Sequence, residues 1–128
     1  MTPRARRRDN PRMSPAEIVD RQLDAYNARD LERFVACFDE RVQAFRPPVP
    51  EAAIEGRAAL AKHYAANRFN LPGLKAEIVD RIALGNLVID HERIFGVRDA
   101  PFEAAVVYEI AGGLIRRMWL YVPAWQSA

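Results

Sequence analysis

Tyr26-Asn27-Ala28-Arg29-Asp30-Leu31 connects two segments that both have the spacing of amphipathic helices. The first segment begins at Ser14, which can form a capping box with Glu17. Asp30 caps the second, shorter helix. Its expected buried stripe consists of Leu31, Phe34, Val35 and Phe38. Because the connection is so short, the two helices must pack as neighbours.

The segments after this helix pair predict one further helix and a set of hairpins. Short strands are expected at 42–45 and near 53–54, and a third helix from Gly56 to about Arg68. From Leu74 onward the apolar period is two, which is typical of strands. The apolar residues of the first long strand alternate as Leu74, Ala76, Ile78, Ile82 and Leu84. Hairpin signals at Gly85-Asn86 and Gly112-Gly113 then predict a meander.

These elements together predict an α+β fold over residues 14–123. Three N-terminal helices would pack on one face of a curved, mostly antiparallel sheet, and such a sheet can enclose a pocket. A chain of 128 residues that is 50% apolar and 28% charged fits one globular domain. No stretch is long and apolar enough to span a membrane. The single cysteine, Cys37, and an N-terminus without an apolar run favour a cytoplasmic location.

The charge of the chain is unevenly distributed. Its formal net charge is +2, but residues 1–12 hold five arginines against Asp9, a net +4, so the remainder carries −2. Residues 1–13 are expected to form a disordered Arg-rich tail, and residues 124–128 a short C-terminal tail whose Trp125 could fold back onto the sheet. Nucleic-acid binding is not expected, because the tail lacks aromatic side chains for stacking and the body lacks a basic stripe.

Five segments of the chain carry a resemblance to a known family. They are residues 23–31, residues 38–42, residues 54–60, and the closing pair 108–110 and 113–115. With them the chain resembles the nuclear transport factor 2-like superfamily, and within it the SnoaL-like polyketide cyclase and ketosteroid isomerase branch. The resemblance implies a conical pocket between the helices and the concave sheet face, and frequent dimerisation through the opposite face. Members include isomerases, cyclases, epoxide hydrolases, dehydratases and non-catalytic assembly modules, so function has to be inferred from the site.

The catalytic positions of ketosteroid isomerase are poorly matched here. The position of its general base carries Arg46, whose guanidinium cannot abstract a proton. Its oxyanion-binding positions fall near Gln22 and Val106, and only the supporting tyrosine finds a match, at Tyr64. SnoaL-like cyclases use an acid near the end of the last strand, and residues 119–123 contain none. Neither mechanism is therefore expected.

Asp90 and Glu92 are the candidate catalytic residues. They lie two apart on one expected strand, so both side chains point to the same face. Aligned to the isomerase pattern, that face looks into the pocket, where one of two paired carboxylates would have a raised pKa and serve as acid or base. In the alternative interpretation both acids face solvent or bond to Arg81 and Arg116 across strands, because a one-residue bulge would reverse the face.

The remaining candidates are residues that would contact a ligand. Tyr64 and Tyr108 are expected to donate hydrogen bonds, and Arg46 to hold an anionic group or one of the two acids. The full set of expected binding residues is Tyr26, Phe38, Arg46, Tyr64, Val106, Tyr108 and Met118. His63 either reaches the rim of the pocket or is an exposed helix residue. No cluster of side chains has metal-ligand spacing, so neither a metal nor a cofactor is expected.

Two functions remain open from the sequence. One is a SnoaL-like protein that binds a small apolar or polycyclic ligand and catalyses proton transfer, cyclisation or hydration through Asp90 or Glu92. The other is a non-enzymatic binding or dimerisation module whose pocket is filled by its own side chains. In both, a homodimer through the outer sheet face is expected, because Trp119 and Tyr121 make that face of the last strand apolar.

Overall fold

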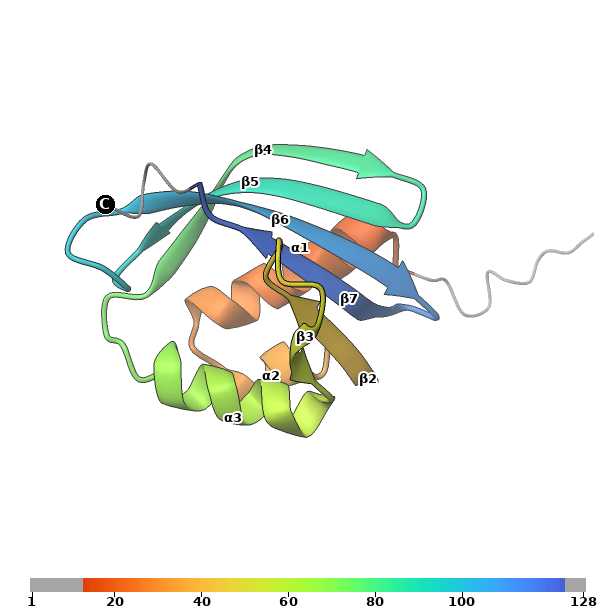
Figure 1. Ribbon diagram of the computed structural model, residues 1–128, viewed down its shortest axis with the longest axis horizontal. Coiled ribbons are helices and arrows are strands. Elements are labelled where there is room, and N and C mark those ends of the chain that lie inside the picture. Colours follow the sequence, from red (N-terminus) through yellow and green to blue (C-terminus); the bar gives the residue numbers. More distant parts are fainter. Residues whose placement is uncertain (1–12, 124–128) are drawn as a thin grey trace, which may run out of the picture.

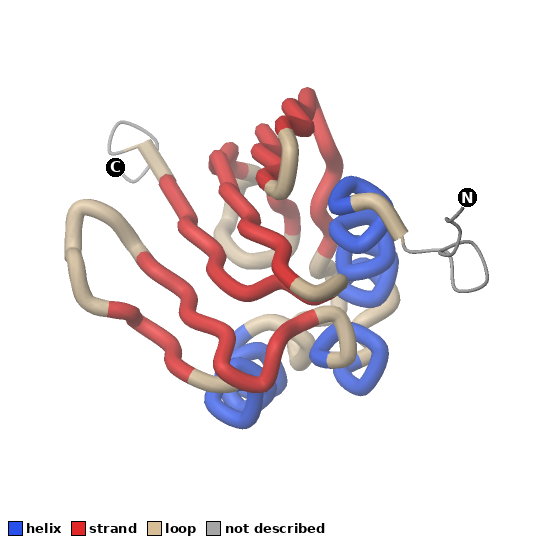
Figure 2. Tube along the Cα trace, turned by 90° about the vertical axis from the view of Figure 1, so that its right-hand side faces the viewer, coloured by secondary structure: helices blue, strands red, loops and turns tan. Residues whose placement is uncertain are grey.

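Three helices lie against one face of a six-stranded sheet in the computed structural model, which describes residues 13–123 (Figure 1). The sheet curls around the helices, as the expected cone requires (Figure 2). The predictions for residues 1–12, for residues 124–128 and for Trp125 lie outside the described residues. Within the described range, no helix has the length and apolarity that crossing a bilayer requires.

The helices are α1 (Pro15–Asn27), α2 (Leu31–Val35) and α3 (Arg57–Asn67). The predicted capping box of α1 is present: the Ser14 backbone N–H donates to Glu17 Oε1 at 2.8 Å, and the Glu17 N–H donates to Ser14 Oγ at 3.2 Å. Asp30 caps α2 by accepting from the Arg33 N–H at 3.1 Å. The helix ends at Val35, so the prediction that Phe38 belongs to its buried stripe is wrong.

The strands run in the order β3-β2-β7-β6-β5-β4 across the sheet. Their bounds are β2 (Phe38–Phe45), β3 (Ala52–Glu55), β4 (Lys75–Leu84), β5 (Leu87–Phe95), β6 (Phe102–Ala111) and β7 (Leu114–Tyr121). The predicted meander of β4 to β7 is confirmed, and among these six strands β2 and β7 form the one parallel pair. β2 begins at Phe38, earlier than predicted, because Phe38 pairs with Ile115 of β7. That partner is distant in the sequence and leaves no local signal.

A bulge in β4 reverses the face of its second half. Ile78 lies opposite Glu92, but Asp80 lies opposite His91, so the register shifts by one residue between them. Ile82 and Leu84, which the period of two groups with Leu74, Ala76 and Ile78, therefore lie on the other face, with exposed fractions of 57% and 68%. The same shift places Arg81 opposite Asp90 on the inner face.

The turn between α1 and α2 is attached to the edge strand β4. The Asn27 Nδ2 donates to the Ala76 carbonyl at 3.0 Å, and the Ala76 N–H donates to Asn27 Oδ1 at 2.8 Å. Arg29, whose φ is 53°, donates from Nη1 to the Leu74 carbonyl at 3.4 Å. The side chain of Asn27 therefore satisfies a backbone peptide that would otherwise be unpaired at the sheet edge.

The loop after β5 touches the loop before β4. Gly96 has a φ of +83°, and a Cβ at this position would lie 2.2 Å from the Gly73 carbonyl oxygen. Only glycine fits both the backbone conformation and this close approach. The contact fixes the start of the loop that carries Val97 and Arg98, both of which line the cavity described below.

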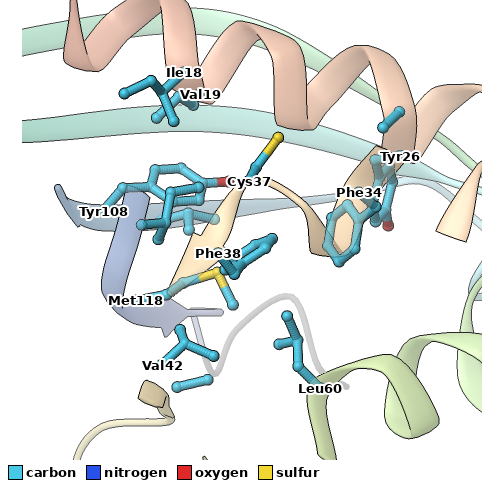
Figure 3. Close-up of a cluster of buried hydrophobic side chains, with 14 of the residues drawn as sticks. Ile18, Val19, Tyr26, Phe34, Cys37, Phe38, Val42, Leu60, Tyr108 and Met118 are labelled. Atoms are coloured by element: carbon cyan, nitrogen blue, oxygen red, sulfur yellow. The ribbon is translucent and has the colours of Figure 1, made fainter. Parts of the chain in front are cut away.

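A cluster of buried apolar side chains lies between the helices and the sheet (Figure 3). Phe34 of α2 is central to it, with its ring centroid 5.0 Å from that of Phe38 and 4.7 Å from that of Tyr64. Ile115, at the start of β7, is fully buried beside them. The first halves of β2 and β7 thus support the core, and their second halves are left to form a cavity.

Candidate active site

A cavity lies between the C-terminal halves of α1 and α3 and the concave face of the sheet. The centre of a water-sized molecule can occupy about 110 Å³ of this cavity, which is open to solvent at its mouth. The make-up of its wall, mostly apolar with a few polar groups, is typical of small-molecule sites. The side chains with polar or aromatic groups on the wall include Gln22, Tyr26, Arg46, His63, Tyr64, Arg68, Glu92, Arg98, Phe102 and Tyr108.

Glu92 is the one carboxylate on the wall among the described residues. It lies on the inner face of β5 with 6% of its surface exposed, and Tyr108 Oη donates to its Oε2 at 3.3 Å. Burial, together with the nearby negative charge of Asp90, raises the pKa of Glu92 to about 7, against the opposing effects of Tyr108 and Arg81. Both protonation states are therefore well populated at neutral pH, as general acid–base catalysis requires.

Asp90 shares the inner face of β5 but has a different environment. It is fully buried and does not line the cavity. Arg81 holds its carboxylate with two bonds, from Nε to Oδ1 at 2.6 Å and from Nη2 to Oδ2 at 2.9 Å. Arg81 also donates to Asp20 of α1 at 2.7 Å, so this group joins the helix to the sheet. The alternative interpretation, in which the acids bond to arginines across strands, therefore applies to Asp90, which bonds to Arg81, and not to Glu92. Arg116, the other arginine of that interpretation, is exposed on β7.

Three tyrosines surround the Glu92 end of the cavity. Tyr26 and Tyr64 meet edge to face, with ring centroids 6.4 Å apart. Burial raises the pKa of Tyr26, that of Tyr64 and, most strongly, that of Tyr108 above the usual range. These hydroxyls therefore stay protonated. Tyr108 donates to Glu92, so Tyr26 and Tyr64 are the ones that can donate to an oxygen of a bound molecule.

Most of the expected binding residues lie on the cavity wall. These are Tyr26, Arg46, Tyr64, Val106, Tyr108 and Met118. Phe38 does not: it is fully buried in the core, because the parallel pairing of β2 with β7 places it at the opposite end from the cavity. His63 reaches the wall, where burial and then the charges of Arg68 and Arg46 lower its pKa.

Two cationic residues on the wall were missed by the sequence reasoning. Arg68 caps the end of α3 four residues after Tyr64, a helical spacing that could have indicated its position. Arg98 lies in the loop between β5 and β6, with its guanidinium carbon 4.1 Å from the ring centre of Phe102. No pattern in the sequence marks this contact. No group of three or more potential metal ligands gathers anywhere in the described part of the chain.

The comparison with protein families identifies the fold and its relatives. A model of the SnoaL-like domain matches residues 19–118, which include most of the residues that line the cavity. The chain belongs to the SnoaL-like domain family. No curated protein matches the sequence.

Solved structures similar to this SnoaL-like domain show the same architecture. An uncharacterized cystatin-fold protein from Novosphingobium aromaticivorans is 24% identical, with a TM-score of 0.75 over 84% of this chain and 97% of its own. A proposed ketosteroid isomerase from Kribbella flavida is 23% identical, with a TM-score of 0.73 over 85% and 77%. A proposed polyketide cyclase from Sinorhizobium meliloti is 18% identical, with a TM-score of 0.71 over 81% and 93%. At these identities the likeness establishes the fold alone.

Proposed function

We propose that this SnoaL-like domain binds a small apolar or polycyclic molecule in its cavity and moves a proton to or from one of its carbon atoms. The observation that carries this proposal is the Glu92 carboxyl, which is buried, lines an open cavity and has a pKa of about 7. A carboxyl in this state can act as base when ionised and as acid when protonated. The open cavity also favours a ligand-binding protein over a module whose pocket is filled by its own side chains.

The proposal assigns separate roles to the residues around Glu92. Tyr108 orients the carboxyl through its 3.3 Å hydrogen bond. Tyr64, whose pKa is raised by burial and in part by the charge of Glu92, would donate to the oxygen on which negative charge develops when the proton leaves carbon. Asp90 is a positioning residue, because it does not line the cavity and acts through its charge on Glu92. Proton transfer of this kind is a step in isomerisation, cyclisation and hydration.

The test uses 5-nitrobenzisoxazole, whose ring opening requires only one proton abstraction from carbon. Glu92 takes the C3 proton, the C–H electron pair completes a nitrile, and the N–O bond breaks to release a coloured phenolate. We expect kcat/KM to rise with pH to a plateau, with a midpoint near 7, because the ionised form of Glu92 is the base. A rate no higher than that of free acetate at equal concentration, or a midpoint below pH 5, would contradict the proposal.

We further propose that the domain forms a homodimer through its outer sheet face. Five apolar side chains lie opposite one another on adjacent strands of that face, in the order Ile82, Ile89, Val107, Trp119 and Phe45. The rings of Phe45 and Trp119 stack, with centroids 5.6 Å apart and planes inclined by 15°. A continuous apolar row of this kind is typical of a protein interface.

Light scattering during size-exclusion chromatography tests the dimer. We expect the wild type to have the mass of two chains and Val107→Lys, at the centre of the row, to have the mass of one, because the lysine would be buried without a partner. Ala65→Lys is the control, since Ala65 is exposed on α3, on the other side of the sheet. A monomeric wild type at 50 µM, or a Val107→Lys variant that stays dimeric, would contradict this interface.

A further inference from the structure

The cavity of this domain has an excess of positive charge on its wall. Arg46 follows β2, Arg68 ends α3 and Arg98 lies after β5, so three separate elements each contribute a guanidinium. Glu92 is the one carboxylate on the same wall among the described residues. This concentration of positive charge is local, because residues 13–128 together carry a formal charge of −2. The wall therefore has the opposite sign to the body that surrounds it.

None of these three guanidiniums forms a salt bridge to a carboxylate within the described residues, whereas Arg33, Arg81, Arg93 and Arg117 each do. Arg68 instead donates from Nη1 to the Asn67 carbonyl at 2.8 Å, and Arg98 lies over the ring of Phe102. Neither contact brings a negative charge to the guanidinium. An arginine in this state is prepared to bind a carboxylate or phenolate oxygen.

Two of the three cations, Arg46 and Arg68, act on residues of the α3 side of the cavity. Arg68 and Arg46 both lower the pKa of His63, and both oppose the rise in the pKa of Tyr64. They are therefore electrostatically close to the α3 wall. Arg98 and Phe102 stand on the sheet side of the same cavity.

The interior of the cavity limits what kind of anion fits. Ile94, Val106, Met118 and Leu120 line its sheet wall between the charged groups. A small hydrophilic anion such as phosphate would leave this apolar surface without a partner, while an extended aromatic molecule would cover it. The wall thus combines an apolar surface with cationic groups.

We propose that the ligand is an aromatic or polycyclic organic acid, whose carboxylate or phenolate is bound by Arg46, Arg68 and Arg98 while its apolar body extends toward Glu92. This inference rests on the proposed function, because it assumes that the cavity is a ligand site. It defines the ligand further, as an organic anion with a ring system. The positive wall would also stabilise negative charge that develops when Glu92 removes a proton.

Calorimetry with two probes of the same shape tests the charge requirement. 2-Naphthoate carries the carboxylate, and 2-naphthamide replaces it by a neutral amide. We expect the wild type to bind 2-naphthoate at least tenfold more tightly than 2-naphthamide, and this preference to shrink as NaCl is raised. We expect Arg46→Gln and Arg98→Gln each to lower the affinity for 2-naphthoate by about fivefold or more. The affinity for 2-naphthamide should be unchanged in both variants. Arg116→Gln is the matched control, because Arg116 is exposed on β7 and does not line the cavity.

The outcomes separate this inference from the proposed function. Equal affinity for the two probes, or equal effects of Arg98→Gln and Arg116→Gln on 2-naphthoate, would overturn the inference. If 5-nitrobenzisoxazole is still opened with a midpoint near pH 7, the proposed function would survive that result. If neither probe binds and the ring is not opened, both the inference and the proposed function fail.

Discussion

Glu92→Gln is expected to lower kcat/KM for the ring opening of 5-nitrobenzisoxazole by about 10²- to 10⁴-fold at pH 8, the range typical of a lost general base. The amide has the shape of the carboxyl and its oxygen can still accept the hydrogen bond from Tyr108 Oη. The loss would therefore report chemistry and not a change of fold. Glu77→Gln is the control, because Glu77 is exposed on β4. A Glu92→Gln variant that keeps more than a third of the wild-type rate would contradict the assignment.

The same variant is expected to be more stable than the wild type at pH 8. Its loss of activity would therefore not be caused by unfolding. The pKa of Glu92 is raised from 4.5 to about 7 in the folded state, so its contribution to stability is full below pH 4.5 and is lost as the pH rises through 7. At pH 8 the buried charge destabilises the fold by about 3 kcal/mol, and Glu92→Gln removes this charge. Urea unfolding should therefore find the variant more stable than the wild type at pH 8, with the difference shrinking toward pH 4.

Arg81→Met is expected to reduce the free energy of unfolding by about 3–5 kcal/mol, because it leaves the Asp90 carboxylate fully buried without its ion-pair partner. Asp20→Ala removes the other partner of the same arginine and is the matched control. Asp20 has 59% of its side chain exposed, so its loss should reduce the unfolding free energy by less than about 1 kcal/mol. Chemical denaturation measures both variants.

A double variant tests whether the loss of stability comes from the unpaired charge and not from any change at position 81. Arg81→Met combined with Asp90→Leu removes both charges and should recover most of the lost stability, because an apolar pair can replace a buried ion pair at little cost. If Arg81→Met reduces stability no more than Asp20→Ala does, the buried pair does not hold β4, β5 and α1 together. If the double variant is no more stable than Arg81→Met, the uncompensated charge is not the cause of the loss.

The fold follows from local patterns wherever a turn fixes the register. Gly85-Asn86 joins β4 to β5 directly, and the alternation along β5 then places Asp90 and Glu92 on one face. The early start of β2 could not be predicted in this way, because Phe38 pairs with Ile115 far along the chain. The bulge after Ile78 also lacks a signal: Val79 suits a strand as well as its neighbours do.

The candidate site could be predicted only where it depends on the alternation of side chains between the two faces of a strand. The sequence placed two acids on one strand but could not distinguish them, because the difference between Asp90 and Glu92 is set by Arg81. The bulge brings Arg81 to the inner face, where it neutralises Asp90 and leaves Glu92 to the cavity. Arg98 could not be placed either, since a loop residue's position depends on the backbone contact between Gly96 and Gly73.

The measurement that tests the account most directly is a ¹³C NMR titration of the Glu92 side-chain carboxyl carbon. The resonance is assigned by its absence from the spectrum of Glu92→Gln. Because the carboxyl is buried beside Asp90 in the wall of the cavity, the account predicts a titration midpoint near pH 7. A midpoint below pH 5 would mean that Glu92 is an ordinary ionised carboxylate at neutral pH, which contradicts its role as the acid–base group.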